Sequence, residues 1–218
     1  MSGYLNELDA RELLCTYGIP MAKSFCCKNA EDLLLVAEKL SFPIVMKILS
    51  SDILHKTEAK CVFIGIKDIA QASEAFSVIM NNARSYMPDA VIDGVLVQEM
   101  AEKGLELIIG FKRDPQFGPV IMAGSGGIYV EVYKDIALRL IPISRYDAES
   151  LLMETKVAQI INGARGTMYD KEALIDVLLK VSSMIEQNES IEEIDINPFF
   201  LYGEGKGGKG VDALIKMR

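Results

Sequence analysis

The stretch VIDGVLVQEMAEKGLELIIGFKRDPQFGPVIMA, residues 91–123, decides the fold class of this chain. It holds three strand-like runs in succession, at residues 91–100, 105–111 and 119–123. No helical pattern lies between them. Strands that come in runs argue against a doubly wound parallel sheet, in which strands alternate with helices. We therefore expect an α+β fold.

Helical and strand-like patterns continue on both sides of this stretch. Apolar residues recur at helical spacing over residues 5–17, 30–40, 70–87, 148–161 and 171–187, and strand-like runs are found at residues 43–48, 61–66, 128–132, 191–202 and 211–216. Asn29 and Asp68 precede two of the helices as candidate N-caps. The last two runs predict a hairpin.

The segment GEGKGGKG, residues 203–210, matches the first seven positions of the nucleotide-binding P-loop pattern G-x-x-x-x-G-K. A P-loop next needs Ser or Thr for magnesium, and then a helix whose N-terminus faces the phosphates. Here Gly210 follows, and the chain continues in an extended apolar run. We therefore predict a surface loop at the turn of the closing hairpin.

Composition narrows the class of protein. Half of the 218 residues are hydrophobic, which is enough for a well-buried core. Apolar stretches stop well before the ~20 residues that span a bilayer, and residues 1–7 lack the pattern of a secretory signal, so we expect a cytoplasmic protein. The four cysteines contain no C-x-x-C pair, and the one histidine is not spaced with them as in a zinc site, so reduced thiols are expected.

The net charge of −8 argues against a nucleic-acid partner, because a phosphate backbone would be repelled on average and no cluster of Lys and Arg offsets this. ATP is a different case, because magnesium and a few local cations neutralise its phosphates.

A lysine interrupts the apolar strand at residues 43–48. Lys47 is the one charged residue in the run PIVMKI, so its ammonium should enter a mostly buried setting, where it would bind an anion. The alternative is an ammonium that reaches water at the end of the strand.

Two groups of oxygen-bearing side chains suit a nucleotide and its metal. Asp195 and Asn197 are two residues apart on one strand, so they share a face, and the hairpin return brings Asp212 beside them. Mg²⁺ binds such oxygens, although polar residues on a hairpin can also simply face solvent. Glu99 and Glu106 lie at the ends of successive strands, where backbone groups could meet an adenine edge and a carboxylate could accept ribose hydroxyls. The alternative is a Glu that is simply solvated at a strand end.

The one histidine, His55, lies in the polar loop SSDILHKTE, residues 50–58, between two predicted strands. A neutral imidazole can take a phosphoryl group on nitrogen, whereas the alternative is an inert loop residue. The segment GSGG, residues 124–127, could present backbone N–H groups to a phosphate or form a plain turn.

Four segments taken in order resemble the ATP-grasp β subunits of ADP-forming acetyl-CoA and acyl-CoA synthetases, relatives of succinyl-CoA synthetase. They are ILHK (53–56), RDPQFGP (113–119), GGIYVE (126–131) and DINP (195–198), and the resemblance runs from residue 17 to residue 213. It implies an ATP-grasp fold of two α+β lobes with the nucleotide cleft between them. Residues 1–100, with a leading helix, would form the N-terminal lobe and residues 101–218 the C-terminal lobe.

The resemblance also implies the chemistry of an acid–CoA ligase (ADP-forming), in which acyl-CoA, ADP and phosphate give acid, CoA and ATP through phosphohistidine. His55 would pass the phosphoryl group between ADP and a partner, a CoA-binding α subunit or domain with its own phosphorylated histidine. We therefore expect a hetero-oligomer that contacts neither nucleic acid nor membrane. The implied ATP or ADP ligands are Lys47, Lys56, Val97, Glu99, Met100 and Glu106, and the implied Mg²⁺ ligands are Asn197, Asp212 and Asp195.

The chain departs from the family pattern at Lys60-Cys61, where the family usually has paired glycines. These side chains could crowd a loop that must approach phosphates, or Lys60 could supply a replacement cation. Two other functions therefore stay open. One is a catalytically silent ATP-binding regulatory or scaffold module of the same fold, and the other is an ATP-grasp ligase that acts through a free acyl phosphate without a partner.

Overall fold

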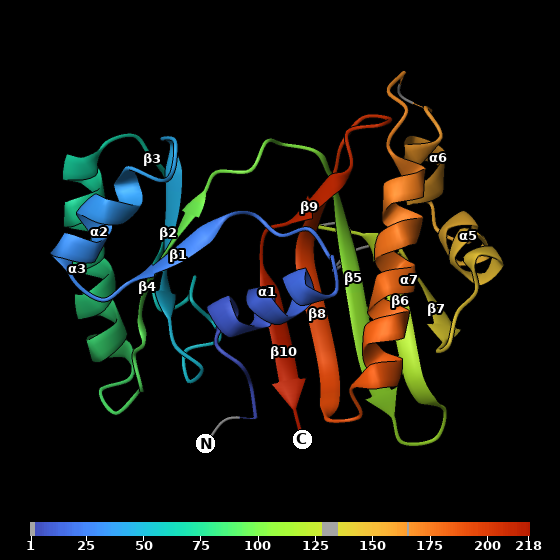
Figure 1. The fold of residues 1–218 in the computed structure, drawn as a ribbon, viewed down its shortest axis with the longest axis horizontal. Coiled ribbons are helices and arrows are strands. Elements are labelled where there is room, and N and C mark those ends of the chain that lie inside the picture. Colours follow the sequence, from blue (N-terminus) through green and yellow to red (C-terminus); the bar gives the residue numbers. More distant parts are fainter. Residues whose placement is uncertain (1–2, 128–134, 165) are drawn as a thin grey trace. The chain divides into compact units, whose positions relative to one another are not determined.

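The computed structural model describes residues 3–127, 135–164 and 166–218, and Figure 1 traces the chain. It divides into two compact units: unit 1 is Met1–Asp9 with Ala22–Ala101, and unit 2 is Ala10–Met21 with Glu102–Arg218. The first helix, α1 (Glu7–Thr16), therefore begins in unit 1 and continues in unit 2. That residues 1–100 and 101–218 form two separate lobes remains a prediction.

Unit 1 is a four-stranded sheet with two helices. The strands lie in the order β1 (Ser24–Cys27), β4 (Gly94–Glu99), β2 (Ile44–Leu49) and β3 (Val62–Ile66), and each neighbouring pair is antiparallel. Helices α2 (Ala30–Ala37) and α3 (Ile69–Tyr86) lie together beside this sheet (Figure 1). The predicted cap residues are confirmed, because Asn29 accepts a hydrogen bond from the Asp32 amide and Asp68 accepts one from the Gln71 amide.

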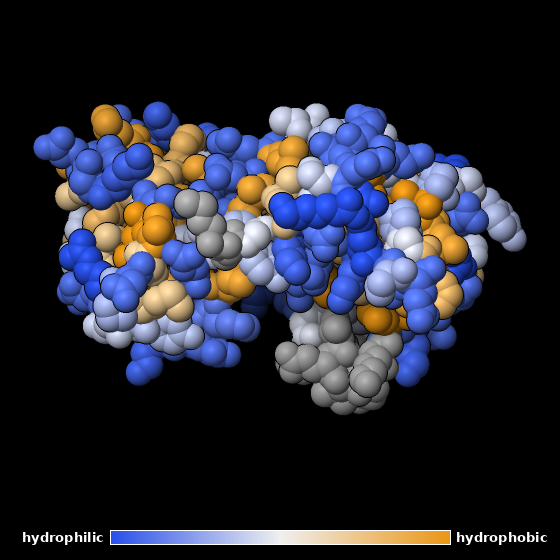
Figure 2. Space-filling model, turned by 90° about the horizontal axis from the view of Figure 1, so that it is seen from below, coloured by the Kyte–Doolittle hydropathy of each residue, from blue (hydrophilic) through white to orange (hydrophobic). Residues whose placement is uncertain are grey.

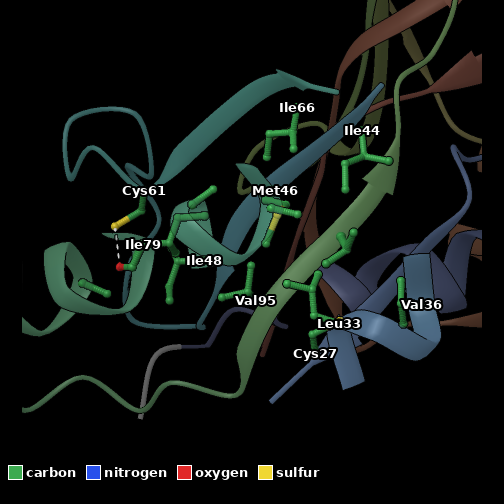
Figure 3. Close-up of a cluster of buried hydrophobic side chains, with 14 of the residues drawn as sticks. Cys27, Leu33, Val36, Ile44, Met46, Ile48, Cys61, Ile66, Ile79 and Val95 are labelled. Carbon is green, nitrogen blue, oxygen red and sulfur yellow. Dashed lines mark hydrogen bonds between the residues drawn. The ribbon is translucent and has the colours of Figure 1, made fainter. Parts of the chain in front are cut away.

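The core of unit 1 forms between the sheet and these helices. Alternate residues of β2, Met46 and Ile48 among them, pack against Ile79 of α3 and Val95 of β4 (Figure 3). All six residues of β2 are buried, so the opposite face of this central strand is covered as well. A strand buried on both faces is the setting in which a charged side chain needs a partner.

Unit 2 is built on a larger sheet with the order β10-β8-β5-β6-β7, and β9 pairs with β8 beside this path. Its strands are β5 (Leu105–Asp114), β6 (Gly118–Ser125), β7 (Ile136–Leu140), β8 (Ile191–Leu201), β9 (Gly208–Gly210) and β10 (Ala213–Met217). Its further helices are α5 (Arg145–Met153), α6 (Val157–Ile161) and α7 (Lys171–Gln187). In Figure 1, α7 crosses the face of the sheet with α5 beside it.

The α+β prediction is confirmed, and the named strands pair antiparallel throughout both sheets. The single helix predicted over residues 148–161 is wrong, because the chain forms α5 and α6 instead. At the junction of the two helices, the backbone amides of Lys156 and Val157 donate hydrogen bonds to the carboxylate of Asp135. These bonds start α6 as a new helix. Three short strands, β1, β7 and β9, were not predicted, and the strand predicted at residues 128–132 lies outside the described residues.

The glycine-rich segment at residues 203–210 forms the predicted turn. Gly205 and Gly207 both have φ of 73°, a conformation that suits glycine, and β9 then pairs back onto β8. The Gly207 amide donates to the Asp170 carboxylate, which fixes the turn against the start of α7. A strand, β10, follows rather than a helix, so the rejection of a P-loop is confirmed.

The segment RDPQFGP, residues 113–119, has a structural role in unit 2. The Arg113 guanidinium donates hydrogen bonds to the carbonyls of Ile191 (2.8 Å) and Asn188 (3.1 Å), which lie just beyond the C-terminus of α7. The Asp114 carboxylate accepts from the amides of Gln116 and Phe117 and so shapes the β5–β6 turn. The segment therefore joins a hairpin to a helix end.

The surface is mixed in character. On the face drawn in Figure 2, hydrophilic residues predominate and hydrophobic ones form separate patches. Within the residues that the structure describes, no helix combines the length and the apolar character needed to cross a membrane.

Candidate active site

Lys47 lies at the centre of unit 1. It pairs with Val62 of β3 on one side and with Leu96 of β4 on the other, and it is only 5% exposed. Its ammonium donates a hydrogen bond to Oε1 of Glu7 at 3.0 Å. The predicted buried setting is thus confirmed, and this lysine binds an anion that the sequence did not reveal.

Glu7 also pairs with a second lysine. Its Oε2 lies 2.9 Å from the Lys56 ammonium, so one carboxylate bridges Lys47 and Lys56. The side chain of Glu7 is 1% exposed, and a buried carboxylate of this kind needs such partners. Two positive charges and one negative charge leave the cluster with a net positive charge, which suits an anionic ligand.

His55 is presented to solvent by a well-anchored loop. Its side chain is 74% exposed, and Nδ1 lies 3.9 Å from the carboxylate of Glu58. On either side, Ile53 and Ala59 are buried, and the Ala59 amide donates to the His55 carbonyl. An accessible imidazole on a fixed backbone is the arrangement that a phosphoryl carrier requires.

Lys60 and Cys61 do not crowd this loop. Cys61 is buried, and its thiol points toward the carbonyl of Ile79 in the core of unit 1 (Figure 3). Burial raises the pKa of this thiol, so it stays protonated. Lys60 is exposed and has φ of 54°, a left-handed conformation that glycine adopts at lower cost.

Replacing Lys60 by glycine should stabilise the chain. A left-handed conformation costs a residue with a Cβ about 1–2 kcal/mol, and glycine returns part of this as unfolded-chain entropy. We expect Lys60→Gly to raise the free energy of unfolding by about 0.5–1 kcal/mol in urea titrations. Lys60→Ala is the control and should change little, because it keeps the Cβ. A lower stability for Lys60→Gly would contradict the strained conformation.

The predicted adenosine-binding residues of unit 1 occupy different environments. Val97 has no exposed surface and packs in the core, so only its backbone is available to support a ligand. Glu99 ends β4, and its carboxylate accepts a hydrogen bond from the Lys23 amide at 2.9 Å. Met100 follows the strand and is 40% exposed. The accessible part of this segment is therefore its C-terminal end.

One face of the unit 2 sheet carries the predicted acidic residues. Ile194 and Ile196 are buried, and Asp195 alternates with them on the opposite face of β8. Asp195 pairs directly with Gly110 of β5. Glu106 lies four residues before Gly110 on the same strand, so it belongs to this same face.

Asp195 and Asn197 lie on β8, and Asp212 directly precedes β10, which pairs with β8. The backbone N–H of Asn197 donates a hydrogen bond to the backbone carbonyl of Asp212 at 3.3 Å, so the returning strand of the hairpin lies beside β8. Burial raises the pKa of Asp195 to about 6, and the negative charges of Asp212 and Glu193 add to the effect. Oδ1 of Asp195 is buried without a hydrogen-bond partner.

This set fits a magnesium ion. An orphaned carboxylate oxygen beside a second carboxylate is unfavourable alone and is stabilised by a divalent cation, which takes carboxylate, amide and phosphate oxygens. Across the described ranges, no three His, Cys, Asp or Glu side chains converge as a metal site.

Two glycines pack closely on Glu106. The Gly126 amide donates to the Glu106 carbonyl at 2.8 Å, and a Cβ at Gly127 would lie 2.5 Å from the Glu106 carboxylate. Gly127 also has φ of 63°. These glycines therefore shape the surroundings of Glu106, which is a more specific role than the general turn or phosphate loop considered for residues 124–127.

Glu7 and Asp135 are two buried polar residues that the sequence did not single out. Glu7 has the pattern of an ordinary acidic residue in the first turn of a helix, and its partners lie 40 residues or more away. Asp135 accepts hydrogen bonds from the Ser125 hydroxyl and from the start of α6. In neither case does a local sequence pattern predict the contact.

Known proteins of one family match this chain along almost its whole length. Residues 1–217 match the ATP-grasp domain family. The chain is 42% identical over 214 residues to the β subunit of acetate–CoA ligase [ADP-forming] II from Pyrococcus furiosus, covering 97% of this chain and 91% of that subunit.

Solved structures are similar along almost the whole chain. A crystal structure of a protein from Pyrococcus horikoshii Ot3 has a TM-score of 0.95 and 39% identity, over 99% of this chain and 92% of that one. A Ca. Korarchaeum cryptofilum dinucleotide forming acetyl-coenzyme A synthetase 1 with coenzyme A and Ca-AMPCP has a TM-score of 0.93 and 38% identity, over 99% and 93%. The chain therefore belongs to the ATP-grasp domain family and is homologous to the β subunits of ADP-forming acetate–CoA ligases.

Proposed function

We propose that this chain is the nucleotide-binding β subunit of an ADP-forming acyl-CoA synthetase, and that His55 carries the phosphoryl group. The observation that supports this most is the exposed His55 on a loop whose next residue, Lys56, is held together with Lys47 by one carboxylate. A nucleophile and a pair of cations are the groups that phosphoryl transfer requires.

The relay has two steps. A phosphorylated histidine of the CoA-binding partner gives its phosphoryl group to an imidazole nitrogen of His55, so that one N–P bond breaks and another forms. A terminal oxygen of ADP then attacks this phosphorus, the second N–P bond breaks and ATP results. Because His55 is exposed, a partner can reach it without a rearrangement of the buried neighbours.

Each proposed nucleotide ligand has a distinct role. Lys47 and Lys56 neutralise phosphate charge, and Glu99, Met100 and Glu106 meet adenosine, with Val97 supporting the strand from the core. Asp195, Asn197 and Asp212 would hold Mg²⁺, which neutralises phosphate charge when bound. A further Korarchaeum synthetase structure, with Mg-AMPPCP and a phosphohistidine segment pointing towards the nucleotide binding site, is 35% identical with a TM-score of 0.84, over 99% of this chain and 93% of that one.

The partner would be a CoA-binding α subunit or domain, because the Pyrococcus furiosus relative is the β subunit of its enzyme. We place the reaction in the cytoplasm, on the ground that all four cysteines are free thiols.

Reconstitution tests this function. The chain mixed with its CoA-binding partner should form ATP from acyl-CoA, ADP and phosphate, and neither component alone should do so. ATP formation by this chain alone would instead favour a ligase that acts through a free acyl phosphate. Nucleotide binding without turnover by the mixture would favour the silent regulatory module.

A further inference from the structure

We propose that Glu7 is a positioning residue: it holds the ammonium groups of Lys47 and Lys56 on one carboxylate, orienting them for phosphate and fixing the loop that carries His55. This inference rests on the proposed function, because it presupposes that Lys47 binds nucleotide phosphates.

The three side chains come from three separate elements of unit 1. Glu7 lies in the first turn of α1, Lys47 at the centre of β2, and Lys56 in the loop before β3. The two carboxylate oxygens are divided between them, with Oε1 at 3.0 Å from Lys47 and Oε2 at 2.9 Å from Lys56. The side chains of Glu7 and Lys47 are buried, at 1% and 7% exposure, and that of Lys56 is 12% exposed. A bridge of this kind sets both lysine positions at once.

Charge explains why the bridge matters for a phosphate. Two ammonium groups held close together repel each other, and long flexible lysine stems let them swing apart toward water. The carboxylate offsets this repulsion while leaving the cluster positive. The Lys47 ammonium has three N–H donors, and the hydrogen bond to Glu7 uses one of them.

The contact between Glu7 and Lys56 also helps to position His55, the proposed nucleophile. Lys56 directly follows His55, and the Lys56 carbonyl accepts a hydrogen bond from the Cys61 amide at 2.8 Å. Its side chain is thus fixed by Glu7 and its backbone by the start of β3. Because His55 itself is exposed, its place in the loop depends on such neighbours.

Glu7→Gln tests the proposal, because it keeps the shape of the side chain and removes its charge. We expect the Kd for Mg-ADP to rise roughly tenfold in calorimetry, since one charge-assisted phosphate contact is misplaced. The Kd for adenosine, which has no phosphate, should not change. Glu12→Gln, an exposed acid on the same helix, is the matched control and should bind both ligands as the wild type does.

A double-variant cycle separates positioning from a merely structural role. If Glu7 acts through Lys47, Glu7→Gln should weaken Mg-ADP binding much less in a Lys47→Met background than in the wild type. Should Glu7→Gln not fold, Glu7→Asp keeps the charge but is too short to bridge both lysines. It should then weaken Mg-ADP binding roughly threefold, again sparing adenosine.

The outcomes distinguish this proposal from the function on which it rests. Unchanged or tighter Mg-ADP binding by the Glu7 variant, with weakened binding by Lys47→Met, overturns the positioning role and leaves the proposed function standing. Equal loss of Mg-ADP and adenosine affinity also overturns it, because the defect is then not specific to phosphate. Wild-type binding by Lys47→Met overturns the lysine assignment and this proposal together.

Discussion

His55→Ala should lower acyl-CoA-dependent ATP formation by roughly a thousandfold or more, because it removes the atom that carries the phosphoryl group. The prediction depends on the reaction passing through this residue. His55 is the one histidine in the sequence, so no other imidazole of this chain can take over. The rate is measured in the mixture of the chain with its CoA-binding partner.

The same variant should keep its fold and its affinity for ADP. The His55 side chain is 74% exposed and its contact with Glu58 is a long surface pair, so little stability depends on it. Calorimetry with Mg-ADP on His55→Ala is therefore the internal control. Near-normal ATP formation by this variant would contradict phosphoryl transfer through His55.

Lys47→Met should weaken Mg-ADP binding by roughly tenfold to a hundredfold, which corresponds to a lost charge-assisted contact of ~1.5–3 kcal/mol. Methionine fills much of the volume of the lysine stem, so the core on that side of β2 should stay packed. The substitution also leaves the buried Glu7 carboxylate with Lys56 and without Lys47. The free energy of unfolding should therefore fall.

Lys67→Met is the matched control for this prediction. Lys67 is an exposed lysine of the same unit, so its loss changes the net charge equally without touching the buried cluster. If both lysine variants weakened Mg-ADP binding to the same extent, the effect would be one of overall charge, and Lys47 would have no specific role.

The sequence predicted the parts of the fold that depend on local pattern. The helix caps Asn29 and Asp68, the apolar strand around Lys47 and the glycine-rich turn are each visible in a short window of residues. The grouping of Asp195 with Asp212 also followed, because a hairpin and a period of two place them without distant information.

Features that depend on distant contacts could not be predicted. The split between α5 and α6 is imposed by Asp135, which lies some 20 residues before the helix that it starts. The short strand β1 is defined by its pairing with β4 rather than by its own four residues. The burial of Glu7 beside Lys47 joins residues 40 positions apart.

The most direct test of the central claim is transfer of label from ATP to this chain. Incubation with Mg²⁺ and γ-labelled ATP should place the label on His55 of the wild-type chain, in an acid-labile linkage, and none on His55→Ala. A wild-type chain that binds the nucleotide but takes no label, or a His55→Ala chain that is labelled equally, would contradict the claim.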